Sequence, residues 1–180
     1  ELAYNWFPPY SYNLALFVFI SGYFYKTDYE ENIGKYIWKR TKRLLIPAYL
    51  WNIFYGGMVA FLGLFGFTIG AKPDLYNLFV MPFVDGEAFQ YNLGSWFVYP
   101  LFLVCIINVL FRKFLKLIHL DNEFIVLIVY LAIGMIGINT AIGNPTAING
   151  IVKLLVRTMF FLPCYEFGRF YKACLLYTSD

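Results

Sequence analysis

Long apolar runs separated by short polar segments make up this chain. Runs without a charged residue, each 24 residues or longer, cover Leu2–Tyr25, Leu44–Ala71, Ala88–Phe111 and Phe124–Val152. A helix that crosses a bilayer needs about 20 such residues. The pattern therefore predicts an all-α fold, a polytopic transmembrane helix bundle, and excludes a water-soluble globular domain.

The runs divide into about five membrane spans when each is limited to the length of one crossing. We expect these spans at Leu2–Tyr25, Leu44–Phe65, Ser95–Phe111, Phe124–Ile138 and Ile151–Phe170. Four connections lie between them: the charged segment Lys26–Arg43, the net acidic loop Gly66–Gly94, the basic segment with Arg112, Lys113 and Lys116, and the uncharged loop Asn139–Gly150.

The composition of the chain excludes several kinds of functional site. Hydrophobic residues make up 61% of the chain and charged residues 14%, against about 25% charged residues in an ordinary soluble domain. The net charge of +3 is too small for a nucleic-acid surface. Three cysteines without paired spacing and a single histidine, His119, support neither a disulfide framework nor a metal site. We expect His119 to be a solvated loop residue.

The lysines and arginines predict the orientation of the spans. If the connections alternate between the two sides, eleven basic residues fall on one side: Lys26, Lys35, Lys39, Arg40, Lys42, Arg43, Arg112, Lys113, Lys116, Arg169 and Lys172. Only Lys72 and Lys153 fall on the other, and Arg157 lies within a span. The positive-inside rule makes the first side cytoplasmic, so the first span runs inward and an outward-running helix is expected before it.

Arg40 and Arg43 stand where the charged segment meets the second span. If one helix runs through both, they share a face, and guanidinium forks suit phosphate. Pro47, four residues after Arg43, cannot donate a hydrogen bond to its carbonyl group and should kink the helix there. The alternative is that both arginines only fix the topology.

Other polar residues within the spans allow both structural and functional interpretations. Ser21 and Gly22 favour close helix packing, because no base for a serine nucleophile is visible nearby. Arg157 and Glu166 form a possible intramembrane site, although they are nine residues apart and cannot pair on one helix face. We expect Glu166 to pair with Arg169, and Arg157 to be functional.

Four further residues within the spans are interpreted as structural. Asn13 and Asn52 are expected to form hydrogen bonds between helices. Trp96 and Tyr99 are expected to be aromatic residues of the membrane interface.

The two ends of the chain predict its domain organisation. The chain begins at Glu1, without an initiator methionine, so we expect a preceding segment. Cys174–Asp180 reads CLLYTSD and is similar to the translation of a sequencing adapter. We therefore expect a partial membrane domain at 1–173 and a non-native tail at 174–180.

Four motifs in this order resemble one family. They are Phe17–Phe24 (FVFISGYF), Lys39–Pro47 (KRTKRLLIP), Gly94–Val98 (GSWFV) and Phe160–Arg169 (FFLPCYEFGR). Together they are similar to the acyltransferase-3 family of bacterial multi-pass membrane acyltransferases, in particular the fucose acetylase and O-antigen acetylase type. The resemblance covers Tyr12 to about Lys172 and implies a parent of roughly ten membrane helices, of which this chain holds a part.

The resemblance also implies a function. Members move an acyl group, usually acetyl from acetyl-CoA as co-substrate, onto a hydroxyl of an envelope glycan or lipid-linked sugar at the bacterial inner membrane, with no bound cofactor and no metal. The paired arginines of the family correspond to Arg40 and Arg43, which would bind the donor. The family's general-base histidine would lie upstream of Glu1, and His119 does not match it. No catalytic residue is therefore expected here, and the chain alone should be inactive.

A multi-pass transporter or a lipid or glycan flippase is the alternative. In that case Arg157 and Glu166 would line a substrate path. An upstream apolar helix that carries a histidine would favour the enzyme.

Overall fold

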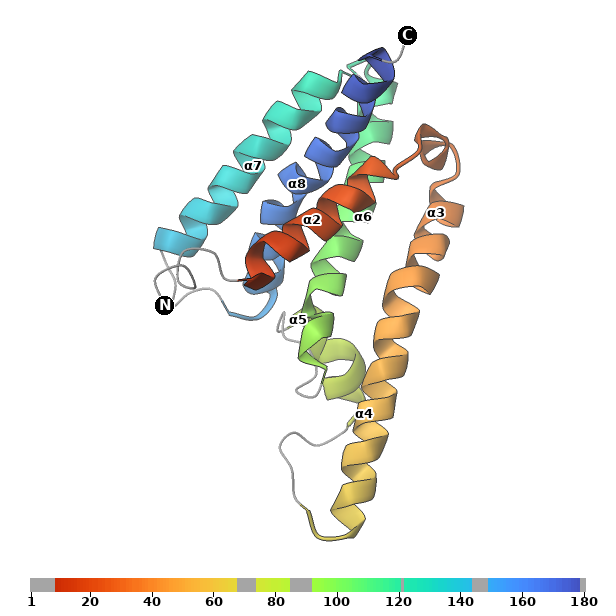
Figure 1. Cartoon of the computed structure of the whole chain (residues 1–180), viewed down its shortest axis with the longest axis vertical. Coiled ribbons are helices and arrows are strands. Elements are labelled where there is room, and N and C mark those ends of the chain that lie inside the picture. Colours follow the sequence, from red (N-terminus) through yellow and green to blue (C-terminus); the bar gives the residue numbers. More distant parts are fainter. Residues whose placement is uncertain (1–8, 68–73, 85–91, 121, 144–148, 179–180) are drawn as a thin grey trace.

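The computed structural model describes residues 9–67, 74–84, 92–120, 122–143 and 149–178. Its α-helices are α2 (Pro9–Tyr23), α3 (Ile33–Arg40), α4 (Ile46–Leu64), α5 (Met81–Val84), α6 (Val98–Leu117), α7 (Glu123–Gly143) and α8 (Gly150–Thr178). Two 3₁₀ turns, η1 (Thr27–Glu30) and η4 (Leu93–Phe97), and two π-helical turns, η2 (Thr41–Leu45) and η3 (Tyr76–Val80), complete it. The described residues contain no strand, so the predicted all-α bundle is confirmed (Figure 1).

Three helices are long and apolar enough to cross a membrane. They are Ile33–Leu64, Gly94–Leu117 and Glu123–Gly143. α2 is shorter, with an apolar stretch at Asn13–Tyr23, and α8 carries charged residues along its 29-residue length. Length and composition thus support three of the five predicted spans as crossings.

The second predicted span is part of a longer helix, and one predicted loop is partly helical. The helix that contains the span at Leu44–Phe65 starts at Ile33 and continues through the basic residues to Leu64. The Gly66–Gly94 loop is partly helical, since η3 and α5 lie within it with Leu78 and Pro82 buried. Three of the charged residues that make this loop net acidic, Lys72, Asp85 and Glu87, lie outside the described residues.

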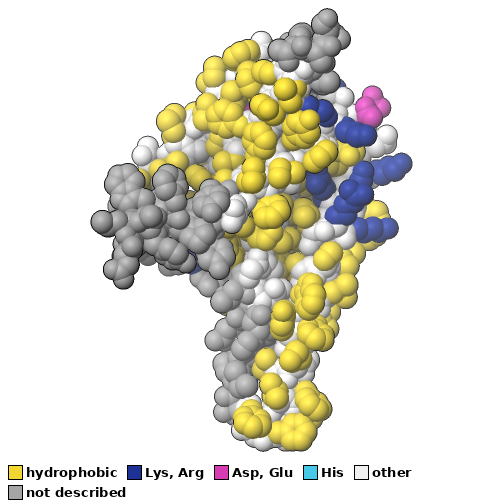
Figure 2. All heavy atoms as spheres, in the orientation of Figure 1, with side chains coloured by type: hydrophobic (Ala, Val, Ile, Leu, Met, Phe, Trp, Pro, Cys, Tyr) yellow, Lys and Arg dark blue, Asp and Glu magenta, His cyan; other side chains and the backbone are white. Residues whose placement is uncertain are grey.

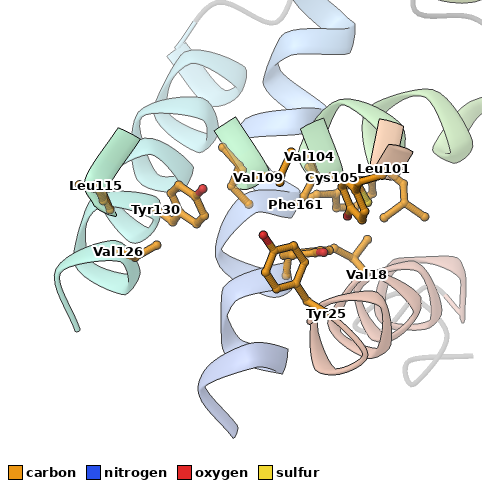
Figure 3. Packing of buried hydrophobic residues seen from close by; sticks show 13 residues of the cluster. Val18, Tyr25, Leu101, Val104, Cys105, Val109, Leu115, Val126, Tyr130 and Phe161 are labelled. Atoms are coloured by element: carbon orange, nitrogen blue, oxygen red, sulfur yellow. The ribbon is translucent and has the colours of Figure 1, made fainter. Parts of the chain in front are cut away.

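α8 is the centre of the bundle and packs against α7, α2 and α6 (Figure 1). The buried core contains side chains from each, including Val18 of α2, Val104 of α6, Tyr130 of α7 and Phe161 of α8 (Figure 3). Small residues set the spacing of α7 and α8. A Cβ atom at Gly134, for example, would lie 2.9 Å from Cγ of Pro163.

The outer surface is apolar, as lipid contact requires. α4 exposes large side chains along its length, among them Leu50, Trp51, Phe54 and Phe61, and Figure 2 shows hydrophobic side chains over this helix and over the upper part of the bundle. Lysines and arginines gather instead in one patch at one edge of this view (Figure 2).

The predicted cytoplasmic segments meet at one end of the bundle. Lys116 at the end of α6 pairs with Glu30 of η1 at 2.7 Å, and Lys172 of α8 donates a hydrogen bond to the Tyr25 carbonyl group at 3.2 Å. Segments that are distant in the sequence therefore share one side, in agreement with the predicted clustering of basic residues.

This arrangement predicts the outcome of cysteine labelling in intact cells, with the exposed Cys174 first replaced by serine. Asp74→Cys should react with a membrane-impermeant maleimide, because the positive-inside rule places it outside. Asp28→Cys should react only after permeabilisation. Labelling of Asp28→Cys in intact cells would reverse the predicted orientation.

Candidate functional site

Arg40 is held at the last turn of α3 by a buried tyrosine one turn earlier. Its Nε donates a hydrogen bond to Oη of Tyr36 at 3.1 Å, and its guanidinium carbon lies 5.2 Å from the centroid of the same ring. Tyr36 is only 2% exposed. The hydrogen bond uses Nε, so it does not occupy the two terminal nitrogens of the guanidinium fork.

A cluster of aromatic rings fixes Tyr36 in turn. Its ring stacks on Tyr29 at 4.7 Å and meets the edge of Tyr25 at 6.0 Å. Tyr25 meets Tyr165 of α8 at 6.3 Å. The position of Arg40 is therefore tied to the bundle centre, and Tyr36 is a residue that the sequence analysis did not single out.

Arg43 has a different setting. It is exposed and lines a pocket of about 280 Å³ together with Pro47 of α4 and Ser95 and Phe97 of η4. Arg40, in contrast, is partly buried against Tyr36. The two arginines occupy successive turns of one continuous helix, as expected, but Arg40 packs against Tyr36 whereas Arg43 lines the pocket.

The helix adapts to Pro47 through a π turn. The Ile46 N–H donates to the Thr41 carbonyl group, five residues back, and the helix then continues as α4. The wider turn accommodates the residue that cannot donate to the Arg43 carbonyl group. The same pattern precedes Pro82, where the Met81 N–H donates to the Tyr76 carbonyl group. The disturbance predicted at Pro47 is thus a π turn within an uninterrupted helix.

The prediction that Glu166 pairs with Arg169 is wrong. Oε1 of Glu166 accepts a hydrogen bond from Nη2 of Arg112 on α6 at 2.5 Å, and these side chains are 0% and 1% exposed. Arg112 also binds Glu123 through both terminal nitrogens, at 3.1 and 2.5 Å. Arg169 reaches Glu123 instead, at 2.6 Å. The physical reason is that Arg112 is buried next to Glu166 rather than solvated.

Arg157 lies against an aromatic ring near the opposite end of α8. Its guanidinium carbon is 4.2 Å from the centroid of Trp96, and both residues line a mainly apolar pocket of about 400 Å³ with Leu14 and Phe161. Trp96 also stacks on Phe161 at 6.4 Å. Trp96 therefore packs within the bundle, and Arg157 and Glu166 do not form one site.

A buried amide network supports η3 and η4. Asn52 of α4 donates to the Leu78 carbonyl group at 2.9 Å and accepts from Nδ2 of Asn92 at 2.7 Å. It also donates to Oη of Tyr99 at 3.4 Å. The predicted interhelical role of Asn52 is confirmed, and its partner Tyr99 on α6 is 1% exposed. Asn13 is exposed on α2.

Gly22 lies at the crossing of α2 and α8. A Cβ atom there would overlap the Tyr165 carbonyl group, and one at Gly168 would overlap the Phe19 carbonyl group. Ser21 is half-buried on the same turn. His119 is exposed in the turn after α6, as predicted, and the described residues contain no group of three residues suited to bind a metal ion.

The comparisons with known proteins complete this description. No curated protein and no solved structure matches the chain. The sequence model of an acyltransferase domain, acyltransferase-3, matches residues 2–176 and so includes the arginine turn, η4 and the Glu166 turn. A match over nearly the whole length does not favour a transporter. The chain belongs to the acyltransferase-3 family.

Proposed function

We propose that this chain serves in an O-acyltransferase of the bacterial inner membrane that moves an acyl group from acyl-CoA, most simply acetyl-CoA, onto a hydroxyl of an envelope glycan or a lipid-linked sugar. Its place in a family of membrane acyltransferases supports group transfer. The acyl donor and the acceptor come from the resemblance to the fucose and O-antigen acetylases, and the general base would be the histidine expected upstream of Glu1.

The observation that carries the proposal is the setting of Arg40 and Arg43. Arg40 is fixed by Tyr36 at the predicted cytoplasmic boundary, and Arg43 opens onto the pocket that contains Ser95. Two guanidinium groups at this boundary suit the pyrophosphate of a cytoplasmic donor. The pocket beyond Arg43 would then receive the acyl end, which must reach into the membrane to meet its acceptor.

Replacement of each arginine by lysine tests this role. Arg40→Lys and Arg43→Lys keep the charge and the positive-inside signal but lose the planar fork. Glycan acetylation by the full-length enzyme should fall more than tenfold, or about 1.4 kcal/mol, with membrane insertion unchanged. The matched control is Lys42→Arg, since Lys42 is exposed between them. Wild-type acetylation in both lysine variants would leave the arginines a purely topological role.

A further inference from the structure

A second polar pocket lies at η1 and α3, on the predicted cytoplasmic side of the donor arginines, and Arg40 itself does not line it. It has a volume of about 420 Å³ and is lined by residues of η1 and α3, including Asp28, Glu31, Lys35, Tyr36 and Lys39. This is within the range of small-molecule sites. Its polar lining distinguishes it from the mainly apolar pocket at Arg157.

Two lysines of this pocket share one face of α3. Lys35 and Lys39 are four residues apart, so their side chains project from successive turns. Nζ of Lys39 donates a hydrogen bond to Oη of Tyr29 at 3.3 Å and lies 5.0 Å from the centroid of its ring. The ammonium group is thus held beside the Tyr29 ring at the pocket, in an exposed position.

The pocket is connected to the donor arginine through one side chain. Tyr36 lines the pocket and accepts the hydrogen bond from Nε of Arg40. A ligand bound at the two lysines would therefore contact the tyrosine that positions Arg40. Asp28 and Glu31 add carboxylates that can accept hydrogen bonds from hydroxyl and amino groups.

We infer that this pocket binds the nucleotide end of the acyl donor, a phosphorylated adenosine, with Lys35 and Lys39 on its phosphate and Asp28 and Glu31 on its ribose hydroxyls or exocyclic amine. The inference rests on the proposed function. An anionic lipid headgroup offers the same phosphate chemistry, but the pocket's connection to Arg40 and its two carboxylates favour the nucleotide.

Equilibrium binding by the protein in phosphatidylcholine nanodiscs tests the inference. Coenzyme A should bind at least about tenfold more tightly than phosphopantetheine, which lacks the adenosine. Lys35→Gln and Lys39→Gln should each weaken coenzyme A binding about fivefold and leave phosphopantetheine binding unchanged. Lys113→Gln, at an exposed lysine of α6 outside this pocket, is the matched control and should change neither.

Three outcomes would overturn the inference. They are equal affinity for the two compounds, unchanged coenzyme A binding in both lysine variants, and loss of that binding in nanodiscs with phosphatidylglycerol, which would assign the lysines to lipid phosphate. A measurement of acetyl transfer distinguishes a failure of this inference from a failure of the proposed function. Transfer by the full-length enzyme with an unchanged KM in the lysine variants overturns only the pocket, whereas no transfer from acetyl-CoA by the wild type overturns the proposed function.

Discussion

Arg112→Met should lower the free energy of unfolding by about 3–5 kcal/mol, because it removes one partner of a buried ion pair and leaves the other charged. Arg112 is 1% exposed and bridges Glu166 of α8 to Glu123 of α7. Its loss would leave the Glu166 carboxylate, which is fully buried, without the arginine that neutralises it. The ends of α6, α7 and α8 should separate.

Reversible unfolding in mixed detergent micelles, followed by circular dichroism, measures this effect. Lys113→Met, at the exposed neighbouring position, is the matched control and should stay within about 0.5 kcal/mol of wild type. Arg112→Met combined with Glu166→Leu should recover at least about 1 kcal/mol, since no charge then remains buried at Glu166. Equal losses at Arg112 and Lys113 would show that the buried network does not stabilise the bundle.

The class of fold was predictable from the sequence because bilayer thickness imposes a length on apolar runs. The positions of the helix ends were less predictable. The helix that starts at Ile33 includes the basic residues before Leu44, and hydropathy treats those residues as a loop although they form regular turns. A span defined by apolar length cannot show how far a helix extends beyond the membrane.

The partners of the charged residues could not be predicted from spacing. Glu166 and Arg169 are three residues apart and could have paired on one helix, yet Glu166 faces Arg112 across the bundle. Which residues meet depends on how α6 and α8 rotate against each other, and a single helix carries no such information. The sequence did contain one indication that Arg112 needs a partner, because it directly follows an apolar run in which a charged side chain is costly.

The arginine site shows the same division between local and tertiary information. The motif around Arg40 and Arg43 is contiguous in the chain and was visible in the sequence. Tyr36, which fixes Arg40, lies one turn earlier, and nothing in the sequence distinguishes it from the other tyrosines of the chain. Its role follows from burial against Tyr25 and Tyr29, which only the fold determines.

Gly22→Ala should also destabilise the bundle strongly, by more than about 2 kcal/mol. The added Cβ atom would overlap the Tyr165 carbonyl group of α8. The obstructing atoms belong to the helical backbone, which cannot turn aside as a flexible side chain can. The two helices must therefore move apart, and Val18 and Tyr165, both fully buried, would lose contacts.

The same substitution at Gly57 of α4 provides the matched control. No heavy atom lies within 4 Å of a Cβ atom built there, so Gly57→Ala should raise stability by up to about 1 kcal/mol through its better helix propensity. Gly168→Ala should behave like Gly22→Ala, since its Cβ atom would overlap the Phe19 carbonyl group. The double variant should cost less than the sum of the two, because one separation of α2 from α8 relieves both overlaps. Unfolding free energies for Gly22→Ala and Gly57→Ala that agree within about 0.5 kcal/mol would contradict a close crossing at this point.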